Sequence, residues 1–68
     1  MCLATAYYVD DQQKELIFQD VSYMEFLGGK IRLVTLLGEE KVVSGQVLDV
    51  NFEGSSIAIE YPKEVNYG

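Results

Sequence analysis

Apolar and polar side chains alternate along most of this chain with the two-residue period that is typical of β-strands. In residues 30–37 the pattern places Ile31, Leu33 and Leu37 on one face of a strand. The same alternation recurs in runs bounded by glycine, aspartate, glutamine or proline. Two more apolar faces are expected, one of Leu48, Val50 and Phe52 and one of Ile57, Ile59 and Tyr61. The runs predict strand segments at residues 2–9, 16–18, 21–27, 30–37, 41–43, 46–52 and 56–61.

Turn residues indicate how these segments connect. Gly28-Gly29 is a strong signal for a two-residue hairpin, because both glycines tolerate positive φ. Gln19-Asp20 predicts a further turn, and residues 10–13 form a polar loop. Gly45 lies inside a strand pattern, which suggests a bulge or bend that curls a short sheet toward closure. Pro62 ends the last strand.

About six short strands joined by turns, with no helical segment of credible length, predict an all-β fold. A small antiparallel SH3-like β-barrel is the most economical architecture. We expect residues 1–61 to form a single domain and residues 62–68 to be a polar C-terminal tail. The hydrophobic content of 49% favours a folded core. A core of this size is marginal, so a metal or a second subunit is expected to add stability.

The charge of the chain narrows the choice of partners. A formal net charge of −6 repels phosphate backbones and anionic lipid surfaces, so nucleic acid is not expected as a partner. No apolar run approaches the roughly 18 residues of a membrane span. We therefore expect no membrane association and a cytoplasmic location, where an unpaired thiol stays reduced.

Catalytic motifs are largely missing from the sequence. The chain has no histidine, no glycine-rich phosphate loop and no serine-centred nucleophile motif, so we expect that it is not an enzyme. The carboxylate pairs Asp10-Asp11 and Glu39-Glu40 both fall at predicted turns. Solvated turn residues are the simpler interpretation of both pairs.

Soft-ligand chemistry is confined to the first two residues. The α-amine of Met1, the amide nitrogen of Cys2 and the sulfur of Cys2 close successive five-membered chelate rings, which suits square-planar Ni(II) or Cu(II). If Met1 is removed, the amine and thiol of Cys2 still close one ring. A second chain with its own Cys2 would complete the ligand set. Alternatively, Cys2 is a small buried residue of the first strand.

The sequence also resembles a known family. The start Met1-Cys2-Leu3-Ala4, the block from Asp20 to Glu40 and the stretch from Gly45 to Ile59 are similar to the CooT family. Its members are small nickel-binding proteins associated with maturation of nickel-dependent carbon monoxide dehydrogenase. The resemblance implies a homodimeric SH3-like barrel in which Cys2 is the nickel ligand.

Two functions follow from these observations. The first is a nickel-binding metallochaperone or store that holds Ni(II) through Cys2 of a homodimer, with Met1 as a further ligand, and serves a nickel enzyme such as carbon monoxide dehydrogenase. The alternative is a small β-barrel interaction module that binds RNA or protein, in which Cys2 is only structural.

Overall fold

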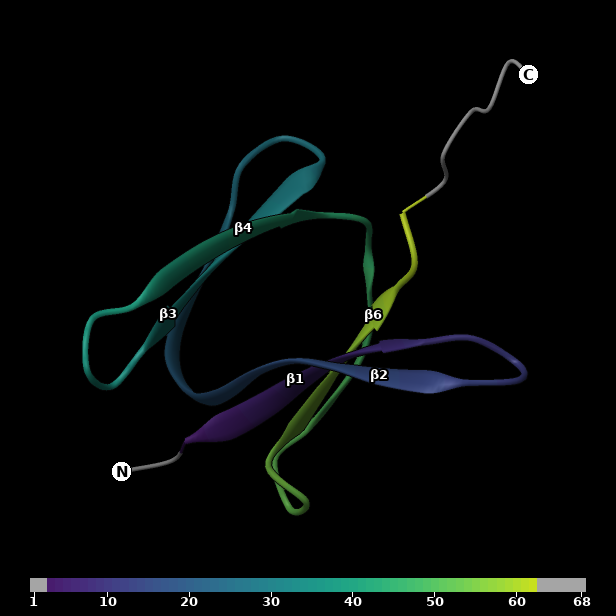
Figure 1. Cartoon of the computed structure of the whole chain (residues 1–68), viewed down its shortest axis with the longest axis horizontal. Coiled ribbons are helices and arrows are strands. Elements are labelled where there is room, and N and C mark those ends of the chain that lie inside the picture. The colour runs from purple at the N-terminus through teal and green to yellow at the C-terminus, as the bar shows by residue number, and fades with distance from the viewer. Residues whose placement is uncertain (1–2, 63–68) are drawn as a thin grey trace.

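The computed structural model describes residues 3–62, and these residues form strands and no helix. This confirms the all-β class (Figure 1). No helix in the described range is long and apolar enough to cross a membrane. The six strands are β1 (Ala4–Val9), β2 (Lys14–Phe26), β3 (Lys30–Thr35), β4 (Glu40–Ser44), β5 (Val47–Asn51) and β6 (Ser56–Glu60).

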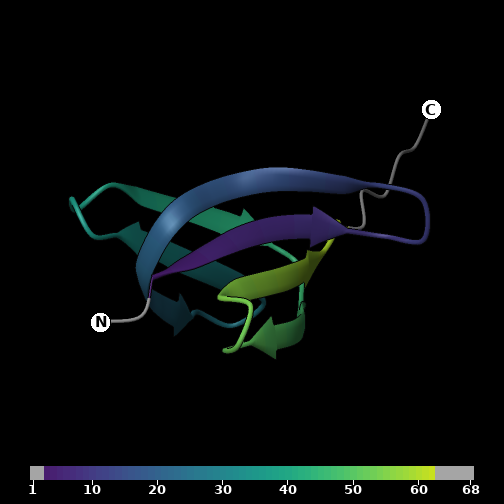
Figure 2. The same ribbon diagram turned by 90° about the horizontal axis from the view of Figure 1, so that it is seen from below.

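The strands form one sheet in the order β4-β3-β2-β1-β6-β5. Neighbouring strands are antiparallel, except that β1 and β6 run parallel. The long strand β2 pairs with β1 through its first part and with β3 through its last part. Figure 2 shows β2 arching across the molecule above both partners. This curvature gives the sheet the shape of a small SH3-like barrel.

The turn predicted at Gln19-Asp20 is wrong, because β2 continues through both residues. Asp20 instead has a φ of 58°, and register shifts interrupt the ladders of β2 with both β1 and β3 in this region. Such irregularities bend a strand while pairing continues on either side. The segments predicted separately at 16–18 and 21–27 are therefore the two parts of one bent strand.

The barrel is half open. Strands β4 and β5 are the two edges of the sheet, yet only Gly45 and Gln46 separate them in the chain. The Glu60 N–H donates a hydrogen bond of 2.8 Å to the Gln46 carbonyl, so this short connection lies against the end of β6. The two edges thus approach each other at one end, but β4 and β5 do not pair in the described range. Gly45 forms the predicted bend.

The hydrophobic core lies on the concave side of the sheet. Ile31, Leu33, Ile57 and Ile59 are buried as their alternation predicted. Leu37, however, is 89% exposed, because β3 ends at Thr35 and the chain turns before Leu37. Burying Leu37 was a wrong prediction. The remaining buried apolar residues are Ala6, Ile17, Val21 and Val43.

The face predicted for Leu48, Val50 and Phe52 is not part of the core. All three side chains are exposed, and Phe52 is 84% exposed in the turn after β5. A register shift between Val47 and Asp49 interrupts the pairing of β5 with β6, and Val47 packs against the core instead. Because β5 is an edge strand, it pairs with β6 alone, and no strand lies along its other edge in the described range.

Candidate metal-binding end of the chain

Met1 and Cys2, the predicted metal ligands, lie outside the described residues. Leu3 is the first described residue, and covalent geometry keeps the Cα atom of Cys2 about 3.8 Å from that of Leu3. The surroundings of Leu3 therefore delimit the part of the surface that the predicted ligands can serve. Leu3 is half-buried and lies directly before β1.

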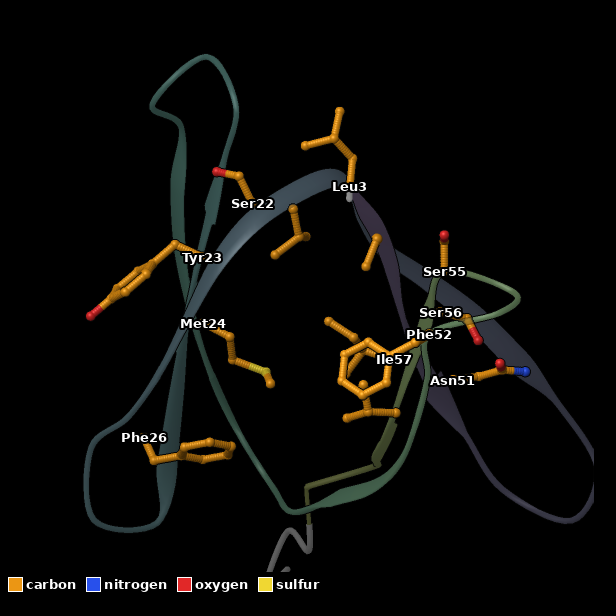
Figure 3. A pocket seen from close by; sticks show the side chains of 13 residues that line it. Leu3, Ser22, Tyr23, Met24, Phe26, Asn51, Phe52, Ser55, Ser56 and Ile57 are labelled. Atoms are coloured by element: carbon orange, nitrogen blue, oxygen red, sulfur yellow. The ribbon is translucent and has the colours of Figure 1, made fainter. Parts of the chain in front are cut away.

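Two hollows meet at Leu3. One is an apolar groove of about 370 Å³ between β2 and the β5–β6 turn, with Leu3 at its edge (Figure 3). The other has a volume of about 300 Å³ and is lined by Leu3, by Gln19 and Asp20 of β2, and by residues 35–37 and Glu39. Leu3 thus lies between an apolar surface and a turn that carries a carboxylate residue, Glu39.

The turn from Thr35 to Glu39 is held by its own hydrogen bonds. The Thr35 N–H donates to the Glu39 carbonyl at 2.8 Å, and the Gly38 N–H donates to the Thr35 carbonyl at 3.0 Å. The buried Thr35 hydroxyl oxygen accepts a further bond of 3.1 Å from the Glu39 N–H. Leu36 N–H donates to the Asp20 carbonyl at 3.0 Å, which ties this turn to the bulge of β2.

The pair Glu39-Glu40 is split between two roles. Glu40 pairs with Arg32, whose Nη1 also lies 3.1 Å from Oε1 of Glu25. The hydrogen bond that Arg32 donates to Glu40 is the main reason why the pKa of Arg32 is raised. Glu39 and Asp20 instead line the hollow beside Leu3. These two carboxylates add negative potential close to the start of the chain, which favours cations there.

The other carboxylate pair behaves as a turn. Asp10 accepts backbone hydrogen bonds of 2.8 Å from Gln12 and 2.9 Å from Gln13. The Gln12 bond is the largest cause of the lowered pKa of Asp10. This carboxylate therefore organises the β1–β2 loop, in agreement with the interpretation of the pair as turn residues.

Among residues 3–62, no three histidine, cysteine or carboxylate side chains come close enough to hold one metal ion. A site with three such ligands would therefore have to draw on donors outside that range, as Met1 and Cys2 are, or on another chain. The described structure places Asp20 and Glu39 along the same hollow as Leu3, but it does not test the ligands predicted from the sequence.

Basic side chains do not form a track for nucleic acid in the described part of the chain. Arg32 is engaged with Glu25 and Glu40. The Nζ of Lys14 lies 4.1 Å from the centroid of the Tyr7 ring, and that of Lys41 lies 5.7 Å from that of Phe18. These two lysine side chains therefore lie against single aromatic rings, Tyr7 and Phe18.

The sequence profile of the family described as CO dehydrogenase accessory protein CooT matches residues 1–60. This chain belongs to the CooT family. The match begins at residue 1, so it includes the Met-Cys start and confirms the resemblance seen in the sequence.

The structure of this chain is also similar to a solved structure. The crystal structure of a CooT candidate from Carboxydothermus hydrogenoformans matches with a TM-score of 0.84 and 21% sequence identity. The match covers 91% of this chain and 100% of that one. At this identity the likeness establishes the shared fold. No curated protein sequence matches this chain significantly.

Proposed function

We propose that this CooT chain is a nickel-binding metallochaperone or store that acts in maturation of carbon monoxide dehydrogenase. It holds Ni(II) through the thiolate of Cys2 and the α-amine of Met1, or through the amine of Cys2 where Met1 is removed. Two chains form a homodimer, and each contributes its Cys2. The protein acts in the cytoplasm as a binding protein and not as an enzyme.

The observation that carries this proposal is the family match from residue 1 to residue 60. The family is described as an accessory protein of CO dehydrogenase, and the matched region includes the only cysteine of the chain. A sequence without histidine leaves the thiolate as its one soft, anionic donor. The net charge of −6 and the carboxylates beside Leu3 attract a divalent cation to this end of the chain.

The number of metal-donor atoms that one chain can supply supports the proposal of a dimer. One chain supplies at most an amine, an amide nitrogen and a thiolate near its start, while a square-planar site takes four donors. A second chain related by a twofold axis supplies the same donors from the opposite side. The homodimer would then supply the missing ligands and also compensate for the small core of a single chain.

Replacing Cys2 tests the proposal directly. Titration of the wild-type chain with one equivalent of Ni(II) should produce a thiolate-to-nickel charge-transfer band. Cys2→Ser should remove this band and lower nickel affinity at least about tenfold, because a serine hydroxyl is not an anionic soft donor at neutral pH. Both proteins carry no tag at the N-terminus, and affinity is measured by calorimetry.

Met24→Leu is the matched control, because Met24 is the only sulfur-bearing side chain in the described residues and leucine conserves its volume. Its nickel binding should equal that of the wild type. An unchanged isotherm for Cys2→Ser would contradict the ligand assignment. A Cys2→Ser protein that no longer folds would favour the alternative of an interaction module in which Cys2 is structural.

A further inference from the structure

A third hollow, of about 520 Å³, lies at the end of the barrel where β3 begins and β4 ends. Phe26, Ile31 and Val47 supply its apolar lining, and Lys30 and Gln46 supply polar side chains. No carboxylate is among its lining residues in the described range, although the chain carries a net charge of −6. The hollow is therefore a partly apolar, positively charged opening in an acidic chain.

Lys30 is the charged side chain of this hollow. Within residues 3–62, Arg32 pairs with carboxylates, whereas Lys14 and Lys41 lie over aromatic rings. No ion pair or ring contact joins the Lys30 side chain to another residue of that range. Lys30 precedes the buried Ile31 in β3, so it faces away from the core at the rim of the hollow. A fitting occupant combines apolar side chains with a carboxylate.

The chain leaves its last strand beside this hollow. The Glu60 N–H donates a bond of 2.8 Å to the carbonyl of Gln46, which lines the hollow. Gly45 also lines it, and a Cβ atom added there would lie 2.5 Å from the Glu60 carbonyl oxygen. Figure 1 shows the connection from β4 to β5 passing beside the end of β6. Only two residues separate Glu60 from residues 63–68.

Tyr61 fixes the point from which residues 63–68 start. Its ring stacks on that of Tyr8, with centroids 5.2 Å apart and planes inclined by 21°. Its hydroxyl donates a hydrogen bond of 3.4 Å to Glu15. Pro62 follows, and its ring restricts the backbone further. Six residues span at most about 20 Å when fully extended, so the neighbouring hollow is within reach of this segment.

The sequence of residues 63–68 is complementary to the hollow. In an extended chain Val65 and Tyr67 point to one side and Glu64 to the other. The hollow has the same arrangement, with apolar lining toward the core and Lys30 at the rim. We infer that residues 63–68 fold back across this hollow as a strap, with Val65 and Tyr67 on the apolar lining and Glu64 paired with Lys30.

Tethering favours this segment over a dissolved ligand. A short linker holds its segment at an effective concentration of about millimolar, and the anchored Tyr61 shortens the linker to a few residues. The strap also adds apolar contact to the end of a small core. Residues 63–68 lie beyond residues 1–60, which the family profile matches, so the strap is a feature of this chain. It does not depend on nickel binding.

NMR spectroscopy of the untagged full chain tests the strap. Nuclear Overhauser contacts should join the Tyr67 ring to the methyl groups of Ile31 and Val47. Tyr67→Ser should shift these methyl resonances, because it removes the ring current of a packed aromatic side chain. Asn66→Ser is the matched control, since its side chain lies on the other side of the extended segment and its loss should leave the resonances in place. Circular dichroism verifies that each variant folds.

Charge exchange tests the predicted ion pair. Lys30→Glu should move the same methyl resonances toward their positions in Tyr67→Ser, because it places two carboxylates side by side. Adding Glu64→Lys to that variant should return them toward the wild-type positions. No return would overturn the pairing of Glu64 with Lys30.

Three further results would overturn the strap. They are the absence of contacts to the Tyr67 ring, methyl resonances that do not respond to Tyr67→Ser, and an equal response to Asn66→Ser. A mixture of isotope-labelled and unlabelled chains identifies the chain that fills the hollow. Contacts found only between different chains would assign the hollow to the segment of a second copy and overturn the intramolecular strap.

Discussion

Gly45 is the residue on which the closure of the barrel most directly depends. Its φ of 133° lies in a region that side chains rarely adopt. A Cβ atom added there would lie 2.5 Å from the carbonyl oxygen of Glu60, which is backbone and has little freedom to move. Only a glycine therefore allows the two-residue connection from β4 to β5 to pass against the end of β6.

We expect Gly45→Ala to lower the free energy of unfolding by about 2–4 kcal/mol, through backbone strain and overpacking. Gly28→Ala is the control, because Gly28 also has positive φ but an added Cβ meets no atom within 4 Å. Its cost should be about 1 kcal/mol. Urea denaturation of both variants at one protein concentration measures the difference, and equal losses would show that the contact with Glu60 does not constrain the fold.

The β1–β2 hairpin is the element whose stability should depend most clearly on pH. The carboxylate of Asp10 accepts hydrogen bonds from Gln12 and Gln13 across the loop, and these bonds lower its pKa. A carboxyl whose pKa is lower in the folded chain contributes stability above its unfolded pKa. That contribution is lost as the pH falls through the lowered value.

We therefore expect the amide resonance of Gln12 to shift with a midpoint below about 3.9, the reference value for aspartate. Two-dimensional NMR spectra recorded over a pH series measure this midpoint. Asp10→Asn retains an acceptor oxygen without a titrating charge, so its Gln12 resonance should lose this transition. A wild-type midpoint at or above the reference value would contradict the role of Asp10 in the loop.

Charge is the property of the whole molecule that most restricts its partners. Non-specific binding to nucleic acid comes from lysine and arginine side chains that neutralise phosphates. This chain carries 11 acidic and 5 basic residues. In the described range Arg32 is paired with carboxylates, while Lys14 and Lys41 lie over aromatic rings.

We expect no measurable binding of single-stranded RNA at physiological salt, measured by fluorescence anisotropy with a labelled oligonucleotide. Lys14→Glu serves as the control, since removing a positive charge should change nothing if no binding exists. Tight binding by the wild type that weakens in Lys14→Glu would favour the interaction module over the nickel-binding protein.

Local patterns were enough to predict much of this fold. The Gly28-Gly29 turn forms as expected, with φ values of 50° and 86°. The predicted apolar residues Ile31, Leu33, Ile57 and Ile59 are buried. Their alternation could be read locally, because successive side chains of a strand point to opposite faces whichever strands lie beside it. Membership of the CooT family was also visible in the residues themselves. The metal ligands Met1 and Cys2 remain predictions, since they lie outside the described residues.

Tertiary structure decided what depends on distant partners. The parallel pairing of β1 with β6 joins segments about fifty residues apart, and no local pattern encodes it. The continuous path of β2 through Asp20 arises because both parts pair with different neighbours, which outweighs the local turn signal. The exposure of Phe52 also depends on tertiary structure, because Phe52 lies in the turn that follows β5, an edge strand of the sheet. Alternation shows which residues share a face, but the arrangement of the sheet determines whether that face is covered.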